Sequence, residues 1–255
     1  MEKVTIKNRK NQNIVLILEK AQDQKGLAFV MHGLGGFKEQ PHIETFAKAF
    51  SDASYTVVRF DTTNTYGESD GDYADATTTN YYEDLEDVIS WAKTQPWYQE
   101  PFCLSGHSLG GISTALYAEK YPEKLKALAP ISTVVSGELS LKTFPKEELE
   151  NWKKTGWRER ESETTPGQIK RLKWTHIEDR MKYDLLPQVE KLTMPVLLIV
   201  GEKDEHLFES QTLFAAISGS KKELHLIKGA PHTFRTPEHL AEIKNILDKW
   251  VEKIG

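Results

Sequence analysis

A serine lies in the motif GHSLGG at residues 106–111, between an apolar run and a segment of good helix formers. A serine on a sharp turn from strand to helix is held in a strained backbone conformation with its hydroxyl exposed. The N-terminus of the following helix adds a positive field where a negatively charged oxygen would form. The motif therefore predicts Ser108 as a nucleophile, with Gly106 and Gly110 as the small residues that let strand and helix approach.

A serine hydroxyl needs a base to become a nucleophile, and the base needs an acid to orient it. Asp204 follows the most apolar strand-like run of the chain, and His232 follows the last such run. Both positions are at carboxyl ends of predicted strands. We therefore predict a Ser108, Asp204 and His232 triad. Glu202 and Glu205 remain rivals for the acid.

The chain has other histidines that compete with His232 for the part of the base. His225 lies within a strand pattern, and His239 lies inside the last predicted helix. His206 would sit beside its own acid. His232 is therefore the preferred base.

A second glycine-rich loop, HGLGG at residues 32–36, follows the first central strand. Glycines let such a loop turn a backbone N–H inward, toward a developing oxyanion. We expect the backbone N–H groups of Leu34 and Leu109 to form the oxyanion hole, with Gly33 in the supporting loop and His32 as a brace. The spacing matches neither a phosphate-binding loop nor a dinucleotide-binding loop.

The sequence gives no sign of a metal or cofactor site. It has no His-Glu-x-x-His motif and no paired cysteines, and its histidines are scattered. The net charge of −5 gives no reason to expect nucleic-acid binding. We expect neither a metal nor a nucleic-acid partner.

Length and composition favour one α/β domain in a reducing compartment. The 255 residues are too few for two full domains, and 38% are apolar. Cys103 is the single cysteine, so an intrachain disulfide is impossible. The N-terminus lacks an apolar signal core, and no run approaches the roughly 20 apolar residues of a membrane span. We expect a cytoplasmic protein without a membrane span.

The order of predicted elements indicates the fold class. An opening hairpin is followed by alternating strands and helices, which is typical of a mostly parallel sheet covered on both faces. The predicted strands are residues 4–7, 14–19, 27–31, 55–60, 101–104, 126–131, 195–200 and 224–227. The predicted helices are residues 42–54, 80–95, 108–120, 209–217 and 238–253.

An insertion interrupts this pattern. Residues 136–189 are rich in charge and are too short for a sizeable core, so we predict a lid on a core formed by residues 1–135 and 190–255. Within it we expect helices at 145–154 and 176–186, separated by a bend at Thr164–Gly167. The insertion also carries Trp152, Trp157 and Trp174.

These segments together resemble the α/β-hydrolase superfamily along nearly the whole chain. The likeness is to small bacterial esterases that include cinnamoyl and feruloyl esterases, and to monoglyceride-lipase-like and serine-aminopeptidase-like hydrolases. It rests on residues 32–36, 59–71, 106–111, 195–204 and 229–232. The resemblance implies an eight-stranded, mostly parallel sheet, a Ser–Asp–His triad, no cofactor, and a lid after the sixth strand.

One loop departs from the family pattern. Residues 62–69 carry one glycine fewer than these relatives usually have, and one residue more. The loop lies near the rim of the active site in the family, so substrate preference is not carried over.

We predict serine-dependent hydrolysis of a small-molecule carboxylic ester with a small, medium or aromatic acyl group. Peptide or amide hydrolysis and acyl transfer use the same triad and remain alternatives. A catalytically idle binding module is a more remote one. The sequence does not indicate the oligomeric state.

Overall fold

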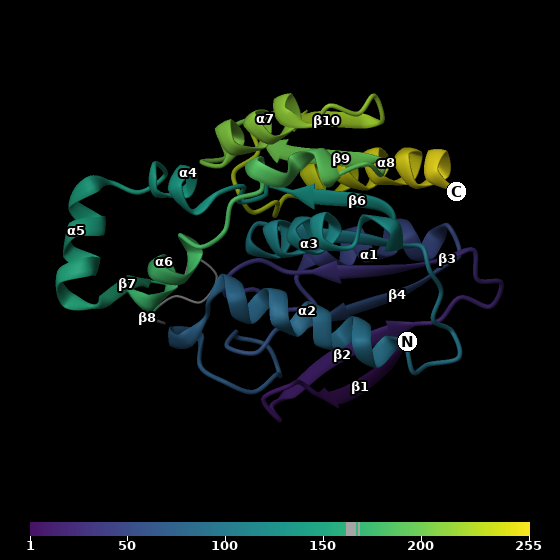
Figure 1. Cartoon of the computed structure of the whole chain (residues 1–255), viewed down its shortest axis with the longest axis horizontal. Helices are drawn as coiled ribbons and strands as arrows, with labels where there is room; N and C mark the ends of the chain where they lie inside the picture. The colour runs from purple at the N-terminus through teal and green to yellow at the C-terminus, as the bar shows by residue number, and fades with distance from the viewer. Residues whose placement is uncertain (162–166, 168) are drawn as a thin grey trace.

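The computed structural model describes residues 1–161, 167 and 169–255, and an eight-stranded sheet forms the centre of this part of the chain (Figure 1). The strand order is β1-β2-β4-β3-β5-β6-β9-β10. The strands are β1 (Glu2–Lys7), β2 (Asn13–Glu19), β3 (Gly26–Met31), β4 (Tyr55–Phe60), β5 (Phe102–His107), β6 (Leu125–Ile131), β9 (Val196–Gly201) and β10 (Lys222–Ile227). Within this sheet β1 and β2 run antiparallel to their neighbours and the other described pairs are parallel, so the predicted opening hairpin and mostly parallel sheet are confirmed.

Helices cover both faces of the sheet, as expected. They are α1 (Pro41–Asp52), α2 (Thr78–Ala92), α3 (Leu109–Lys120), α7 (Leu207–Ala216) and α8 (Pro237–Ile254). The apolar residues of α1 and α8 belong to one hydrophobic core, and those of α2, α3 and α7 belong to another. In α8 the buried residues Ile243, Leu247, Trp250 and Val251 recur at helical spacing, which turns one apolar stripe toward the sheet.

The register of the parallel strands brings their carboxyl ends to one edge. Met31 at the end of β3 pairs with Phe60 of β4 on one side and with Gly106 of β5 on the other. Ile131 at the end of β6 pairs with His107 of β5. The loops that follow these strands therefore leave the sheet at the same edge, where ligands of open parallel sheets bind.

The insertion follows β6 and extends beyond this edge (Figure 1). It contains α4 (Gly137–Leu141), α5 (Lys146–Thr155), β7 (Trp157–Glu161), β8 (Ile169–Lys173) and α6 (Thr175–Arg180). Short 3₁₀ turns, η1 (Tyr73–Asp75), η2 (Pro122–Lys124) and η3 (Leu186–Lys191), complete the described elements. The bend predicted at Thr164–Gly167 lies outside the described residues except for Gly167.

The helix predicted at residues 176–186 is shorter in the structure, where α6 covers Thr175–Arg180. Helix α6 ends at Arg180, because the next residues pair with the start of the insertion. Gly137 donates its N–H to the Tyr183 carbonyl, and Ser136 forms an antiparallel bridge with Asp184. This pairing returns the chain to the core and uses backbone groups that a longer helix would need.

No helix in the described ranges is long and apolar enough to cross a membrane.

A buried ion pair ties the loop after β3 to the loop after β4. The Lys38 ammonium is fully buried and lies 2.8 Å from a carboxylate oxygen of Asp61, which is buried too. Asp61 also accepts the backbone N–H of Lys38 at 2.7 Å and that of Glu68 at 2.8 Å. Three charge-assisted hydrogen bonds thus hold both loops to one carboxylate.

We predict that Asp61→Asn lowers the free energy of unfolding by about 3 kcal/mol, because it leaves a buried ammonium without its buried counter-charge. Chemical denaturation measures the change. Asp52→Asn is the matched control, since Asp52 forms exposed pairs with Lys48 and Lys244, and its loss should cost under about 1 kcal/mol. Equal losses in the two variants would contradict this view of the Lys38–Asp61 pair.

Candidate active site

Ser108 lies at the turn between β5 and α3, in a backbone conformation that is unusual for a residue with a side chain. Its φ is 54° and its ψ is −113°, and its N–H donates to the Ile131 carbonyl of β6 at 2.9 Å. The strand and the helix approach so closely that a Cβ at Gly106 would lie 2.3 Å from the Gly110 carbonyl oxygen. At Gly110 a Cβ would lie 2.4 Å from the His32 carbonyl oxygen. Both positions therefore require glycine.

The three residues predicted as a triad meet at the carboxyl edge of the sheet. His232 Nε2 lies 2.9 Å from Ser108 Oγ, and His232 Nδ1 lies 2.9 Å from Asp204 Oδ1. The same Asp204 oxygen accepts the backbone N–H of His206 at 2.8 Å. Asp204 comes from the loop after β9 and His232 from the loop after β10. The geometry links hydroxyl, imidazole and carboxylate in one hydrogen-bonded chain.

The surroundings of His232 favour its charged form. Burial lowers the pKa of this imidazole, but the hydrogen bond and charge of Asp204, with the charge of Glu205, outweigh burial and raise the pKa above 6.5. For Asp204, burial raises the pKa, yet the partnership with His232 lowers it overall. A carboxylate that stays ionised can stabilise an imidazolium beside it.

The two amides predicted for an oxyanion hole flank the nucleophile. Within the described ranges, neither Leu34 nor Leu109 donates its backbone N–H to an acceptor. The loop that carries Leu34 is closed by a hydrogen bond from the Gly36 N–H to the Gly33 carbonyl at 2.9 Å, with Gly35 at a φ of 65°. At Gly33 a Cβ would lie 3.0 Å from the Ser108 Cβ, so the two loops are in contact.

His32 connects this loop to its neighbours and is fully buried. Its Nδ1–H donates to the Gly33 carbonyl at 2.8 Å, and its Nε2 accepts the Thr62 backbone N–H at 3.0 Å. The Tyr81 hydroxyl also donates to the Gly33 carbonyl, at 3.1 Å. Burial lowers the pKa of His32, so its neutral form fits this role as donor and acceptor.

Sequence reasoning assigned no role to a second imidazole–carboxylate pair beside the triad. His206 Nδ1 lies 2.6 Å from a Glu209 carboxylate oxygen, and the His206 ring lies 4.9 Å from the His232 ring. The other Glu209 oxygen accepts the Val135 backbone N–H at 2.7 Å. The three-residue spacing of His206 and Glu209 at the start of α7 was the only sequence signal for this pair.

His107, inside the serine motif, is another histidine whose position the sequence did not indicate. Its Nε2–H donates to the His232 carbonyl at 2.9 Å, and its ring lies 4.6 Å from the ring of His42. Burial, followed by the charges of His42 and His232, lowers the pKa of His107 well below 6.5. A neutral His107 therefore fixes the backbone of the loop that carries His232.

Glu205, His206 and His232 place one potential metal-binding atom each within 4.8 Å of one another. Both ring nitrogens of His232 already take part in the triad, and Nδ1 of His206 is bonded to Glu209. A metal ion here would compete with the nucleophile for His232.

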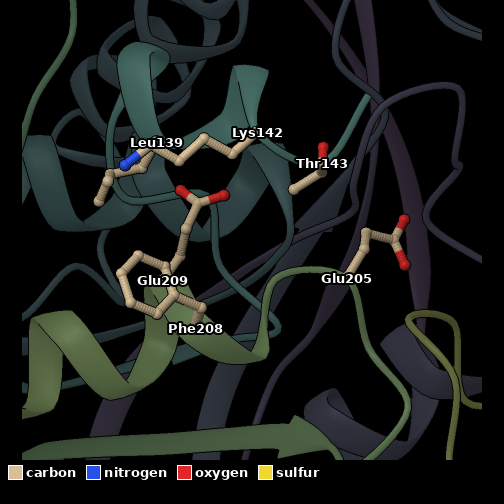
Figure 2. A pocket seen from close by; sticks show the side chains of 6 residues that line it. All are labelled: Leu139, Lys142, Thr143, Glu205, Phe208 and Glu209. Carbon is tan, nitrogen blue, oxygen red and sulfur yellow. The ribbon is translucent and has the colours of Figure 1, made fainter. Parts of the chain in front are cut away.

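A cavity of about 340 Å³ opens between α4 and the start of α7. Figure 2 shows α4 and the following turn on one side of it and the start of α7 on the other. Leu139 and Phe208 supply apolar surface, and Glu205, next to Asp204, lies at its rim. The remaining lining residues are Lys142, Thr143 and Glu209.

Comparison with known families gives one match. The family model described as "Serine aminopeptidase, S33" matches residues 22–164 of the chain. No curated protein matches the chain significantly.

Solved structures show the same fold over the whole chain. Est1E from Butyrivibrio proteoclasticus, solved with bound ferulic acid, is 21% identical, with 98% of each chain covered and a TM-score of 0.81. Alpha/beta hydrolase domain-containing protein 10 from mouse is 21% identical, with 100% of each chain covered and a TM-score of 0.81. The esterase domain of a Rhodothermus marinus protein is 21% identical, with 100% and 99% covered and a TM-score of 0.71. The predicted α/β-hydrolase fold is thereby confirmed.

We predict that Asp204→Asn lowers the pKa of His232 below 6.5, because burial is then opposed only by the weaker effect of Glu205. A titration of the imidazole Cε1–H signals by NMR measures the midpoint in both proteins. Glu202→Gln is the control, since Glu202 accepts the Gly229 backbone N–H and does not touch the imidazole. An unchanged midpoint in Asp204→Asn would show that Asp204 does not set the charge state of His232.

Proposed function

The chain belongs to the S33 serine aminopeptidase family of α/β hydrolases, and on this basis we propose that it hydrolyses carboxylic esters through an acyl-enzyme on Ser108. The observation that carries the proposal is the hydrogen-bonded chain from Ser108 through His232 to Asp204. The backbone amides of Leu34 and Leu109 supply the oxyanion hole in this proposal.

The first half of the reaction forms the acyl-enzyme. His232 Nε2 accepts the Ser108 proton as Oγ bonds to the ester carbonyl carbon, and the carbonyl oxygen becomes an oxyanion held by the amides of Leu34 and Leu109. Asp204 stabilises the imidazolium that results. When the C–O bond to the alcohol breaks, His232 gives the proton to the leaving oxygen.

The second half releases the acid. His232 accepts a proton from water as the water oxygen bonds to the acyl carbon, and the Ser108–acyl bond then breaks. Ser108 Oγ recovers the proton from His232, so the enzyme returns to its starting state. Each oxyanion-hole donor lowers the barrier by roughly 3–4 kcal/mol in known cases.

The substrate proposed is an ester with a small, medium or aromatic acyl group. The cavity between α4 and α7, which Glu205 borders, has apolar surface from Leu139 and Phe208 and a volume that suits such a group. The structurally similar protein Est1E was solved with bound ferulic acid. This supports including esters of aromatic acids among the candidate substrates. In this proposal residues 136–189 act as a lid on a core of residues 1–135 and 190–255, since α4 forms one wall of the cavity.

We predict that Ser108→Ala lowers the kcat for ester hydrolysis by at least about 10⁴-fold, because no other group can form the acyl bond. The assay is a series of 4-nitrophenyl esters from acetate to laurate, together with methyl ferulate. Ser113→Ala is the control, since its hydroxyl donates to the Leu109 carbonyl within α3 and faces no substrate in the mechanism. Undiminished turnover in Ser108→Ala would refute the assignment of the nucleophile.

Hydrolysis of an amino-terminal amide is the second candidate, favoured by the description of the matching family model. We expect aryl esters to be cleaved with a higher kcat/KM than aminoacyl arylamides of the same leaving-group type. A side-by-side panel of the two substrate classes decides between them. Exclusive cleavage of the arylamides would replace the esterase proposal with the peptidase one.

A further inference from the structure

Arg180, at the end of α6, is a buried guanidinium with too few acceptors. It is 5% exposed, and its Nε has no hydrogen-bond partner. A guanidinium carries five N–H donors. Among the described residues it has one acceptor, His176 Nε2, which lies 2.8 Å from Nη2. A buried charge left in this state costs stability, and a partner outside the chain would remove this cost.

His176, the hydrogen-bond partner of Arg180, cannot supply a negative charge. His176 Nδ1–H donates to the Ala76 carbonyl at 2.8 Å, which leaves Nε2 as the acceptor for Arg180. Burial, followed by the charge of Arg180, lowers the pKa of His176 well below 6.5. Trp152 stacks on the His176 ring, with the centroids 6.3 Å apart. His176 therefore stays neutral and holds the guanidinium in one orientation.

The carboxylates nearest to Arg180 are engaged elsewhere. In the described part of the chain, no carboxylate oxygen lies within 4.0 Å of its nitrogens. Glu209 acts on Arg180 electrostatically, but its oxygens bind two backbone amides and an imidazole. Asp179 accepts from Thr79 and pairs with Lys182. Burial lowers the pKa of Arg180 to about 10, so the guanidinium remains charged at neutral pH.

Contacts connect Arg180 to the triad on one side. The Arg180 carbonyl oxygen packs against Gly137, where a Cβ would lie 2.4 Å away. Ser136, the residue before Gly137, donates its N–H to a Glu209 carboxylate oxygen at 3.3 Å. Glu209 bonds to His206, whose ring packs on His232. Arg180 is close enough that its charge opposes protonation of His232.

On the other side, the charge of Arg180 acts on Tyr73, which packs against the loop of the oxyanion hole. Tyr73 packs its ring against Gly35, where a Cβ would lie 2.8 Å from it, and its hydroxyl interacts electrostatically with Arg180 and Arg158. Arg158 lies over the Trp152 ring, 5.2 Å from its centroid, and pairs with Glu148. The charges of Arg158 and Arg180 therefore both act on the residue that packs against the loop carrying Leu34.

From this arrangement we propose that Arg180 binds a carboxylate of the substrate, so that the preferred ester carries a free carboxylate remote from the scissile bond. This proposal rests on the esterase function proposed above. A carboxylate takes two parallel hydrogen bonds from the planar guanidinium and supplies the missing acceptors and the missing charge.

The balance of charge favours a carboxylate over a phosphate monoester. One guanidinium without a carboxylate partner matches one negative charge. Arg158 already has Glu148 at 2.7 Å, so it adds field and not a second unpaired cation. A phosphate dianion would leave one charge uncompensated in a buried site.

Two matched substrates test the proposal. Mono-(4-nitrophenyl) adipate differs from 4-nitrophenyl hexanoate only in a carboxylate that replaces the terminal methyl group. We expect a higher kcat/KM for the adipate half-ester in the native protein. In Arg180→Gln the ratio of adipate to hexanoate kcat/KM should fall at least about tenfold, the effect of losing one charge-assisted hydrogen bond.

Arg171→Gln is the matched control, since it removes an equal charge from the insertion at an exposed pair with Glu159. The substrate ratio should stay at the native value in this variant. Arg180→Lys, which keeps the charge and loses the fork, should give an intermediate ratio. If Arg180→Gln fails to fold, inhibition of the native protein replaces it. Free adipate should then compete with 4-nitrophenyl hexanoate at least about tenfold better than the neutral adipamide.

The outcomes separate this proposal from the esterase proposal. Equal kcat/KM values for the two esters would contradict the carboxylate site but not the esterase proposal. The same holds if the ratio of adipate to hexanoate kcat/KM is unchanged in Arg180→Gln. Equal inhibition by adipate and adipamide would contradict the carboxylate site too. Failure to turn over either ester would instead count against the proposed function. A 4-nitrophenyl ester with a terminal phosphate that outperforms the adipate would show that the site takes phosphate.

Discussion

Ser108 lies in the left-handed region of backbone space, at a φ of 54°, which costs a residue with a side chain of the order of 1–3 kcal/mol. Such a conformation persists only where the surroundings over-determine it. Here the N–H of Ser108 is bound to Ile131, and the glycines at 106 and 110 let backbone pack on backbone at both ends of the turn. The parallel sheet is therefore the source of the geometry, because its register places β3, β5 and β6 level at the same edge.

Charges around this edge fall into two kinds. Lys38 and Asp61 form a buried ion pair in the core. At the active site, His232 Nδ1 lies 2.9 Å from an Asp204 carboxylate oxygen. These pairs fix loops and orient the imidazole. Arg180 differs from both, because it is 5% exposed and no carboxylate in the described ranges pairs with it. Because Lys38 and Asp204 each have a charged partner within the described chain and Arg180 does not, we propose an anion from outside the chain as its partner.

The sheet and the triad candidates could be predicted from the sequence because both depend on local patterns. Each strand is a short apolar run, and the residues that bear chemistry follow such runs directly, as Asp204 does after β9 and His232 after β10. The prediction could not extend to the roles of His206 and Glu209. The packing of His206 on His232 and the hydrogen bond from Val135 to Glu209 join elements far apart in the chain.

The insertion was predicted least well, for a physical reason. The hairpin of β7 and β8 carries alternating charges and little apolar surface, so it lacks the pattern that marks a strand in a core. Helix α6 stops at Arg180 because Tyr183 and Asp184 pair with residues at the start of the insertion, some 45 positions earlier. No local propensity signals such a pairing. No sequence pattern indicated Arg180, because its burial, and not its residue type, makes it unusual.

Intact-mass spectrometry after incubation with a fluorophosphonate, followed by peptide mapping, tests directly whether Ser108 is an activated nucleophile. This reagent phosphonylates a serine whose hydroxyl is activated by a neighbouring base. We predict one adduct per chain, located on Ser108, and a loss of ester turnover in proportion to labelling. A folded protein that takes no adduct, or takes it on another residue, would contradict the claim that Ser108, His232 and Asp204 form a working nucleophile.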